Sequence, residues 1–241
     1  MKKPVKRLLW AMAILPGLII TVAIIFLLNF LIGTKSMTPA ETGAINDSVW
    51  CVKERFVNAY IFKGEKSYLM IDAGLGRKKF KHEMDKLGIN PDQITTILLT
   101  HTDGDHTGSI GLYKNAAVYM HKDEEQMING TTGKTKYFKT KWKYGPYKLL
   151  DDNDTLTIDG VKIKIIHTPG HTPGSACYII GNDYLVTGDN LIVESSKYGN
   201  FIEKFNMNTP EQIESLKTLP PPVAFKYILT AHYGVIKIQS F

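Results

Sequence analysis

Four side chains of types that bind metal ions lie within six consecutive residues near the middle of the chain, in the sequence HTDGDH. The apolar run Ile94–Thr100 precedes them, which indicates a strand that ends in a tight polar loop. Residues two apart on an extended segment point the same way, so His101 and Asp103 can face one ion. Asp105 and His106 are adjacent, but a turn into a helix can aim both at a second position. The pattern suggests two metal ions, although such a cluster is more often a solvated turn.

Three more segments carry a histidine or an aspartate just beyond a strand-like run. The loop HTPGHTPGS contains His171, and its two prolines and two glycines can hold a ligand in place before metal binds. Asp189 lies in the sequence TGDN, and His232 lies in the sequence TAHYG. A carboxylate able to bridge, flanked by imidazoles, suits two borderline divalent ions that hold a water between them.

The elements that must position these residues are expected from hydrophobic periodicity and turn residues. Strands are expected at residues 48–52, 56–62, 68–71, 94–99, 117–120, 161–166, 176–180, 184–187 and 226–229. Helices are expected over residues 77–87, through residues 110–112 and over residues 209–219, the last with Thr209 as N-cap and Pro210 at the first helical position. The run 94–99 is largely apolar, which is typical of a strand buried on both faces.

Two other polar residues lie at the ends of expected strands. Asp72 is followed by Ala73 and Gly74, which suits either a loop that approaches a polar site closely or an ordinary turn. His121 follows the strand 117–120, and we expect it to be an exposed turn histidine.

The N-terminal region contains a long apolar run, because residues Leu8–Ile32 carry no charged side chain. As a helix this run spans about 37 Å, enough to cross a hydrocarbon core of about 30 Å with some tilt. Pro16 and Gly17 interrupt it, which a membrane helix tolerates. A cleaved signal peptide is the alternative, but its apolar region is normally about 7–15 residues. We therefore expect an uncleaved transmembrane helix at residues 8–32.

The charges around this run predict its orientation. Lys2, Lys3, Lys6 and Arg7 precede it, whereas only Lys35 follows closely. The positive-inside bias predicts a cytoplasmic N-terminus and a remainder on the outer side of the cell membrane. Removing these four cations reduces the 29 basic residues to 25, against 23 acidic ones, so the rest of the chain is nearly neutral. The net charge of +6 therefore does not indicate a nucleic-acid partner.

The two cysteines, Cys51 and Cys177, both lie in strand-like runs. An oxidising outer compartment would permit a disulfide between them. We expect buried free thiols instead, because sequence cannot show the short Cα separation that a disulfide requires. Neither cysteine has the spacing of a metal ligand.

The segment 134–148 holds six lysines and five aromatic residues but no acidic residue. We favour a solvated excursion whose rings pack onto the domain. The alternative is a flap that meets anionic substrates or lies on lipid headgroups, where lysine and tryptophan are common.

Five motifs together resemble those of the metallo-β-lactamase superfamily of binuclear hydrolases: MIDAG, THTDGDHTGS, TPGHTPGS, VTGDNL and LTAH, in the family's order from about Ser48 to His232. The resemblance implies an α/β fold, a four-layer αββα sandwich with two metal ions at one edge. It assigns to the first metal His101, Asp103 and His171, to the second metal Asp105, His106 and His232, and to both metals Asp189.

The same resemblance implies a hydrolytic mechanism. The metals would lower the pKa of a bridging water and polarise the scissile carbonyl or phosphoryl oxygen. Asp105 would act as the catalytic residue that orients the nucleophile and shuttles its proton. Asp72 would orient a ligand, and His167 would have a structural or supporting role. The implied substrate is a small molecule: an ester, lactone, thioester, phosphodiester or amide.

The chain departs from the family's pattern at Asp103, where the motif His-x-His-x-Asp-His has its second histidine. With two divalent ions, a hydroxide and three aspartates, the core becomes formally neutral instead of carrying one positive charge. Oxygen ligation also shifts preference from zinc toward iron or manganese. We expect zinc first, because the resembling family uses it most, with iron or manganese possible because of Asp103.

The sequence thus predicts a basic cytoplasmic N-terminus at residues 1–7, a transmembrane helix at 8–32, a linker at 33–41 and a catalytic domain at 42–241. One alternative is a di-iron redox enzyme of the flavodiiron type without its flavin domain, since that branch also has a carboxylate at the position of Asp103. Another is a non-catalytic protein with a degraded metal site, against which the other six ligands argue.

Overall fold

The computed structural model describes residues 3–134, 139–194 and 197–238 of the 241-residue chain. The chain forms two compact units, residues 1–37 and residues 38–241. The division between them falls inside the linker that the sequence predicts at residues 33–41. Each unit is described by itself below.

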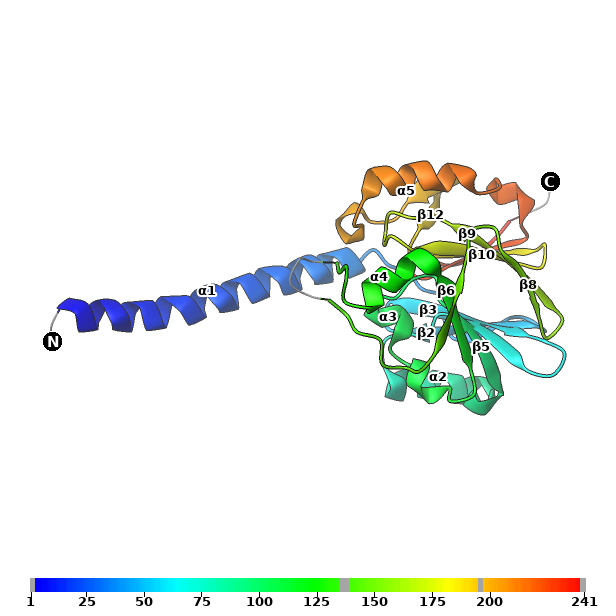
Figure 1. The fold of residues 1–241 in the computed structure, drawn as a ribbon, viewed down its shortest axis with the longest axis horizontal. Helices are drawn as coiled ribbons and strands as arrows, with labels where there is room; N and C mark the ends of the chain where they lie inside the picture. Colours follow the sequence, from blue (N-terminus) through cyan, green and yellow to red (C-terminus); the bar gives the residue numbers. More distant parts are fainter. Residues whose placement is uncertain (1–2, 135–138, 195–196, 239–241) are drawn as a thin grey trace. The chain divides into compact units, whose positions relative to one another are not determined.

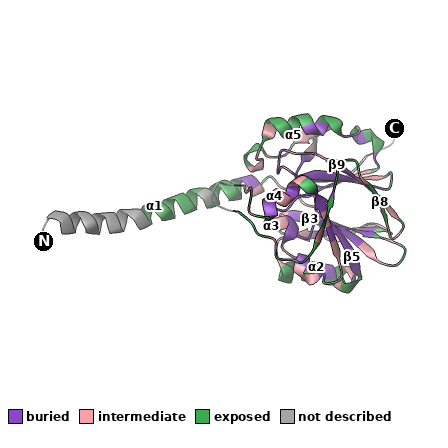
Figure 2. Ribbon diagram, viewed as in Figure 1, coloured by how far each residue is buried: buried purple, intermediate pink, exposed green. Residues whose placement is uncertain are grey.

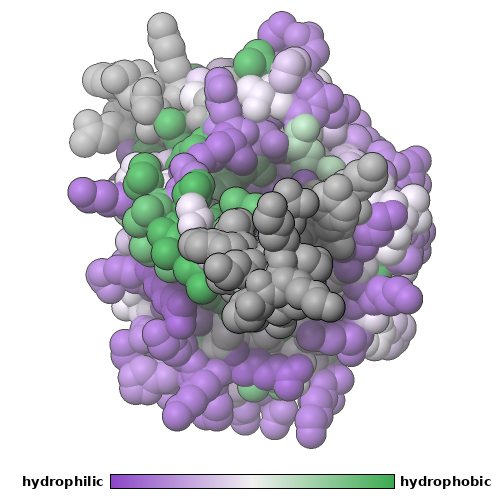
Figure 3. Space-filling model, turned by 90° about the vertical axis from the view of Figure 1, so that its left-hand side faces the viewer, coloured by the Kyte–Doolittle hydropathy of each residue, from purple (hydrophilic) through white to green (hydrophobic). Residues whose placement is uncertain are grey.

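The first unit is dominated by the helix α1 (Lys3–Thr34), which includes the apolar run 8–32. From Gly17 onward its described apolar side chains, such as Leu18 and Ile32, are exposed. Figure 3 shows hydrophobic residues gathered on one face of the molecule that is otherwise mostly hydrophilic. The segment Gly17–Thr34 is long and apolar enough to cross a membrane, a criterion that signal sequences also meet. Membrane anchoring therefore remains a proposal.

The second unit contains two large sheets and a short ribbon, with register shifts only at a few bulges. The first sheet has the strand order β1 (Gly43–Asn46), β2 (Val49–Glu54), β3 (Val57–Lys63), β4 (Tyr68–Ile71), β5 (Ile94–Leu98), β6 (Ala117–His121) and β7 (Tyr147–Leu150). The second sheet has the order β15 (Gly234–Lys237), β14 (Tyr227–Thr230), β11 (Tyr184–Gly188), β10 (Ala176–Ile180), β9 (Val161–His167) and β8 (Thr155–Ile158). The ribbon pairs β12 (Leu191–Glu194) with β13 (Lys197–Asn200).

Helices cover the outer face of each sheet, so the second unit is an αββα sandwich (Figure 1). The α-helices are α2 (Arg77–Leu87), α3 (Gly104–Thr107), α4 (Glu125–Ile128) and α5 (Thr209–Ser215). Short 3₁₀ turns are η1 (Pro91–Gln93), η2 (Ile110–Leu112), η3 (Lys122–Glu124), η4 (Glu203–Phe205), η5 (Leu216–Thr218) and η6 (Pro222–Ala224). This arrangement confirms the fold that the sequence predicts.

Three apolar clusters fill the spaces between the four layers. In the first, Phe80 of α2 packs with Met70 of the first sheet. The second cluster contains Ile71 and Tyr178 and lies between the two sheets. The third includes Leu219 and joins the second sheet to the segment that follows α5. Figure 2 shows that central strands such as β3 and β5 are mostly buried, whereas the edge strand β8 and much of the outer helices are exposed. Each fully buried large side chain contributes about 1.5–3 kcal/mol, so these clusters hold the sheets rigidly.

Several predicted elements match the structure closely. The helix 77–87 and the strands 68–71 and 176–180 have the predicted ends. The strand β5 is buried on both faces, because Ile97 belongs to the cluster on the helix side and Leu98 to the cluster between the sheets. This double burial is what a largely apolar run indicates.

Other predictions need correction. The predicted helix 209–219 is α-helical only to Ser215, and its N-cap is Asn208, not Thr209. The Asn208 side chain accepts a hydrogen bond from the backbone N–H of Glu211, a donor in the first turn that has no partner within the helix. Asn208, the residue before Thr209, is therefore the cap. Residues 110–112 form only a 3₁₀ turn, preceded by the short helix α3.

Parallel pairing explains why the polar loops meet at one edge. The strands β4 and β5 are parallel neighbours in the first sheet, and β11 and β14 are parallel neighbours in the second. Parallel neighbours place their carboxyl ends at the same edge, which is where ligands bind in open α/β sheets. The segments just beyond these four strands supply Asp72, residues 101–106, Asp189 and His232.

Candidate metal centre

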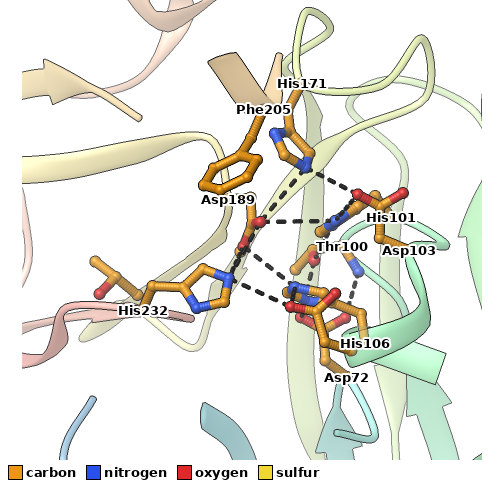
Figure 4. Close-up of polar contacts among 12 residues, drawn as sticks. Asp72, Thr100, His101, Asp103, His106, His171, Asp189, Phe205 and His232 are labelled. Atoms are coloured by element: carbon orange, nitrogen blue, oxygen red, sulfur yellow. Dashed lines mark hydrogen bonds and ion pairs between the residues drawn. The ribbon is translucent and has the colours of Figure 1, made fainter. Parts of the chain in front are cut away.

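The loops at this edge bring together all seven side chains that the sequence predicts as metal ligands (Figure 4). They are His101, Asp103, Asp105, His106, His171, Asp189 and His232. The four histidines are at most 2% exposed, so they are positioned inside the protein and not in solvent. The carboxylates of Asp103 and Asp105 are about a quarter to a fifth exposed, which leaves the centre open on their side.

Four atoms define the first candidate ion position. The Oδ2 of Asp103 lies 3.5 Å from the Nε2 of His101 and 3.2 Å from the Nε2 of His171. The Oδ2 of Asp189 lies 3.4 Å from the Nε2 of His171 and 3.9 Å from the Nε2 of His101. A tetrahedral ion with bonds of about 2.0–2.2 Å separates its ligand atoms by about 3.3–3.6 Å. These separations therefore suit one ion.

The other oxygen of Asp189 belongs to the second candidate position. The Oδ1 of Asp189 lies 3.2 Å from the Nε2 of His106 and 3.0 Å from the Nε2 of His232. The Oδ2 of Asp105 lies 3.8 Å and 3.6 Å from these two nitrogens. Asp189 thus lies between the two groups of ligands, as a bridging carboxylate must, and the Nε2 of His232 is also 3.2 Å from its Oδ2.

The residues present fit a pair of metal ions. Among the described residues, the Nε2 atoms of His101 and His106 and the Oδ1 of Asp189 are buried without a hydrogen-bond partner. A buried polar atom without a partner is costly, and native structures satisfy nearly all of them. All three atoms point into the two candidate positions, where a divalent ion would satisfy them. Imidazole and carboxylate donors suit zinc, iron and manganese.

Hydrogen bonds to the Nδ1 atoms fix how the four histidines face the centre. Asp72 accepts from His106, the backbone oxygen of Phe56 accepts from His232 at 2.6 Å, and the Oδ1 of Asn206 lies 3.2 Å from the Nδ1 of His171. The Nδ1 of His101 lies 3.1 Å from the hydroxyl of Thr100. Occupied Nδ1 atoms leave each Nε2 free to bind an ion, which is the usual arrangement of ligating histidines.

Asp72 has the orienting position that the resemblance implies. Its Oδ1 accepts from the backbone N–H of Thr100, and its Oδ2 accepts from the Thr100 hydroxyl and from His106. The backbone of Asp72 has a φ of 61°, a left-handed conformation that aspartate tolerates better than most residues. Asp72 therefore ties the end of β4 to the segment 101–106.

Gly188 permits the approach of Asp189 to the centre. Gly188 has a φ of 55°, and a Cβ atom there would lie 2.4 Å from the hydroxyl oxygen of Thr100. Only glycine allows β11 to end this close to β5 with this backbone conformation. The residue that follows, Asp189, is thereby placed between the two groups of histidines.

The electrostatic surroundings keep the carboxylates ionised. Burial opposes ionisation of Asp189, but the charges of His232 and His106 outweigh it and hold the pKa of Asp189 well below its usual value. Burial also opposes ionisation of Asp103, but the neighbouring His101 and His171 and the charge of Lys134 outweigh it and hold the pKa of this carboxyl well below its usual value. Burial lowers the pKa of His171 to about 4, so this imidazole is neutral at neutral pH. These are the protonation states that metal ligands need.

His106 behaves differently, because it lies among three carboxylates. Burial lowers its pKa, but the charges of Asp189, Asp72 and Asp105 outweigh burial and raise the pKa of His106 well above its usual value. An ion bound at the second position would replace this proton, so binding there would release a proton and strengthen as pH rises.

Glu124 is a buried residue of the site that the sequence did not reveal. It is fully buried, and its Oε1 accepts from the backbone N–H and the hydroxyl of Thr102, both at 2.7 Å. Its Oε2 accepts from the hydroxyl of Thr172 at 2.6 Å and from the backbone N–H of Gly174 at 3.1 Å. Glu124 therefore ties the loop of His101 to the loop of His171.

His121 corrects a prediction, because it is 1% exposed and not an exposed turn histidine. Its ring stacks on that of His167, with centroids 3.8 Å apart and planes 13° apart, and its Nδ1 accepts from the backbone N–H of Asp123. His167 lies 2.9 Å, through its Nε2, from the backbone oxygen of Pro173 in the loop of His171. This contact fits the supporting role predicted for His167. Burial lowers the pKa of His121 to about 4.

The cysteines and the lysine-rich segment are also placed. Cys51 and Cys177 are free and buried, as predicted, and burial raises the pKa of each thiol to about 12. In the segment 134–148, residues 135–138 lie outside the described residues. Trp142, Tyr144 and Tyr147 pack partly against the cluster beneath them, as the favoured interpretation requires. Lys134 differs from the solvated lysines that this interpretation predicts, because its ammonium group reaches Asp103 of the candidate metal centre.

Comparisons with known proteins agree with this geometry. The family model described as the metallo-beta-lactamase superfamily matches residues 52–232. An atrochrysone carboxyl ACP thioesterase of Aspergillus fumigatus is 26% identical over 163 residues, which cover 66% of this chain and 35% of that protein. A probable metallo-hydrolase of Methanocaldococcus jannaschii is 28% identical over 153 residues, 64% of each chain. The chain thus spans less than two thirds of the length of these relatives, whose names agree with the predicted class of metal-dependent hydrolase.

Solved structures share the fold. A metallo-beta-lactamase family protein from Thermus thermophilus is 22% identical with a TM-score of 0.60, over 80% of this chain and 76% of that one. A B3 metallo-beta-lactamase with an active-site glutamic acid is 17% identical with a TM-score of 0.64, over 89% and 87% of the two chains. The matched residues contain the whole set of convergent histidines and aspartates, and the chain belongs to the metallo-beta-lactamase superfamily.

Proposed function

We propose that this chain is a hydrolase that depends on two divalent metal ions bridged by Asp189. The observation that carries the proposal is the place of Asp189 between two groups of His and Asp ligands, with its Oδ2 3.4 Å from the Nε2 of His171 and its Oδ1 3.0 Å from the Nε2 of His232. Two ions held there would lower the pKa of a water molecule and polarise a carbonyl oxygen. Zinc is the first candidate, and Asp103 makes iron or manganese a candidate as well.

The residues of the chain would supply orientation and proton transfer. Asp105 is 21% exposed, so its carboxylate can contact both the second ion position and a molecule that enters from solvent. A carboxylate in this position can orient a water nucleophile and accept its proton. The buried histidines would hold their places, because hydrogen bonds to their Nδ1 atoms fix them from behind.

Aromatic side chains form an apolar wall beside the histidines. The Phe201 ring stacks on His232, with centroids 5.5 Å apart, and meets the His171 ring edge-on at 5.4 Å. In Figure 4 the Phe205 ring lies beside Asp189 and His171. Such a wall suits an acyl group better than a charged phosphodiester, because apolar surfaces are buried favourably together.

We infer that acyl thioesters are the preferred substrate class. The apolar wall supports this choice, and several relatives of this chain carry the name thioesterase. Esters, lactones, phosphodiesters and amides are the competing classes, since one scaffold can serve many chemistries.

The substrate proposal is tested with full-length protein in detergent, stripped by a chelator and reloaded with zinc, manganese or iron(II). We expect hydrolysis of acyl-coenzyme A thioesters only after reloading, with kcat/KM at least about tenfold above a phenyl ester, a γ-lactone, a phosphodiester and a cephalosporin. We also expect zinc alone to support less turnover than iron or manganese. Full turnover of the chelated protein would contradict metal dependence, and oxygen consumption by the iron-loaded protein would favour redox chemistry instead.

We further propose that α1 anchors the chain in the cell membrane with the catalytic unit on the outer side. The exposed apolar side chains of α1 and the four cations before residue 8 support this placement. The protein should stay with membranes during alkaline carbonate extraction, and external protease should digest the catalytic unit in intact spheroplasts. Release by carbonate, or protection from protease, would contradict the proposal.

A further inference from the structure

The ammonium group of Lys134 lies at the edge of the first candidate ion position. Its Nζ lies 2.9 Å from the Oδ2 of Asp103 and 2.9 Å from the Nε2 of His171. It also donates to two backbone oxygens, that of Phe205 at 2.8 Å and that of His171 at 3.2 Å. The Lys134 side chain is only 29% exposed. A lysine on a solvated loop has none of these contacts.

The number of contacts shows how Lys134 and a metal ion can coexist. An ammonium group has three N–H donors, whereas four acceptors surround this one. When the Nε2 of His171 binds an ion, three acceptors remain for three donors: Asp103 and the two backbone oxygens. The backbone oxygens hold the ammonium group in place whether or not an ion is present. Lys134 therefore need not leave when the first position fills.

The charges at the centre indicate what the contact between Lys134 and Asp103 does. Asp103, Asp105 and Asp189 surround the two candidate positions, and with one hydroxide they balance two divalent ions completely. A cation in direct contact with Asp103 adds one positive charge back to the centre. It also withdraws electron density from the carboxylate, because a charge-assisted hydrogen bond polarises the acceptor. The pair of Asp103 and Lys134 is then a neutral ligand unit, as an imidazole is.

We propose that Lys134 is a positioning residue of the metal centre: it holds Asp103 in its ligating orientation and restores the positive charge that this aspartate removes. The inference rests on the proposed two-metal function. It also separates Lys134 from the other lysines of the segment 134–148. Lys139, for comparison, is exposed and donates only to the backbone oxygen of Thr131 among the contacts that the structure describes.

Two other roles for Lys134 make different predictions. A lysine that merely occupies the first ion position would compete with the ion, so its removal would tighten binding. A lysine that only stabilises the loop would leave the affinity of the first ion unchanged. If Lys134 is a positioning residue, removing it weakens binding of the ion at the first position by about 10–100-fold. This is the usual cost of losing a hydrogen-bond partner behind a metal ligand.

The experiment measures stepwise metal dissociation constants of the full-length protein by competition with a chromophoric chelator, without any substrate. The variants are Lys134→Met, the charge-conserving Lys134→Arg and the matched control Lys139→Met. We expect Lys134→Met to raise the dissociation constant of the ion at the first position by about 10–100-fold. The dissociation constant of Lys139→Met should equal that of the wild type within about twofold, and Lys134→Arg should recover most of the lost affinity. Circular dichroism confirms that each variant is folded.

A second measurement uses the variant Asp103→His, which makes this ligand neutral without help from a lysine. In that background an ammonium group beside the ion only repels it, so adding Lys134→Met should tighten binding of the first ion. Cobalt(II) absorption provides an independent signal, because the d–d bands should change in Lys134→Met and not in Lys139→Met. The opposite signs of the lysine effect in the two backgrounds are specific to the proposed pairing.

The outcomes separate this inference from the proposed function. If wild-type protein binds two ions and Lys134→Met binds them equally or more tightly, the positioning role is wrong and the proposed function stands. If the lysine effect has the same sign in both backgrounds, the pairing with Asp103 is wrong. If wild-type protein fails to bind two ions, the proposed function itself fails.

Discussion

Asp189→Asn is expected to reduce the metal content of the reloaded protein from about two ions to fewer than one per chain and to lower kcat/KM by about a thousandfold or more. The substitution keeps the size of the side chain but removes the charge that faces both candidate positions. An amide nitrogen would also point at a histidine nitrogen or an ion in one of the two positions. Losing several kcal/mol of transition-state stabilisation corresponds to an effect of this size, at about 1.4 kcal/mol per factor of ten. Elemental analysis and thioester kinetics measure the two effects.

Asp183→Asn is the matched control, because Asp183 lies in the turn before β11, the strand that carries Asp189. Its carboxylate is 41% exposed and pairs with Lys226 at 3.0 Å. An exposed pair of this kind contributes about 0–1 kcal/mol, so its loss should leave metal content and turnover unchanged. Retention of two ions by Asp189→Asn would show that this carboxylate does not bridge them.

Glu124→Ala is expected to lower the free energy of unfolding by about 3–5 kcal/mol. The substitution removes the acceptor that four buried donors share: the backbone N–H groups of Thr102 and Gly174 and the hydroxyls of Thr102 and Thr172, the last of which also contacts the Ser175 hydroxyl. It also disconnects the loop that carries His101 from the loop that carries His171, so metal affinity should fall together with stability. Urea unfolding of metal-free and metal-loaded protein measures both effects.

Two further variants make this prediction specific. Glu124→Gln keeps the volume but turns an NH₂ group toward two donors, so it should destabilise the protein nearly as much as alanine. Glu214→Ala removes an exposed carboxylate that pairs only with Lys217 among the described contacts, and it should change stability by less than about 1 kcal/mol. A loss below about 1 kcal/mol in Glu124→Ala would mean that Glu124 does not join the two loops.

The meeting of the seven proposed ligands at one edge was predictable because they lie in loops shortly beyond strand-like runs. An apolar run before His101 or His232 indicates a strand, and parallel strands bring their carboxyl ends to one edge. The resemblance to the metallo-β-lactamase superfamily then implied which residues would share an ion. Asp72 gave the same signal, although its segment alone suited an ordinary turn equally well.

Glu124 and Lys134 were not predictable, because their roles depend on which loops meet in space. Glu124 lies just after β6 and is not part of a recognised motif. Its role is visible only in the structure, where its carboxylate oxygens accept hydrogen bonds from Thr102 and Thr172. Lys134 is one of six lysines in a short segment, and composition cannot tell which of them points inward. A charged residue that satisfies distant backbone groups has no local pattern in the sequence.

The remaining differences have separate causes. His121 was expected in solvent because it ends a strand, but stacking on His167 buries it, and that contact joins segments far apart in the chain. The short strands β1, β7, β8 and β15 lie at or next to the edges of the two sheets. Edge strands have weaker hydrophobic alternation because one side is exposed, so their runs resemble loops. The N-cap of α5 was misplaced by one residue, since Asn208 and Thr209 are both good caps.

Anomalous X-ray diffraction from crystals of the reloaded protein would locate the two metal ions that we propose Asp189 bridges. Data collected on both sides of the absorption edge of the bound metal should show two anomalous peaks, one within bonding distance of each oxygen of Asp189. We expect His101, Asp103 and His171 around the first peak and Asp105, His106 and His232 around the second. A single peak, or two peaks without Asp189 between them, would contradict the account.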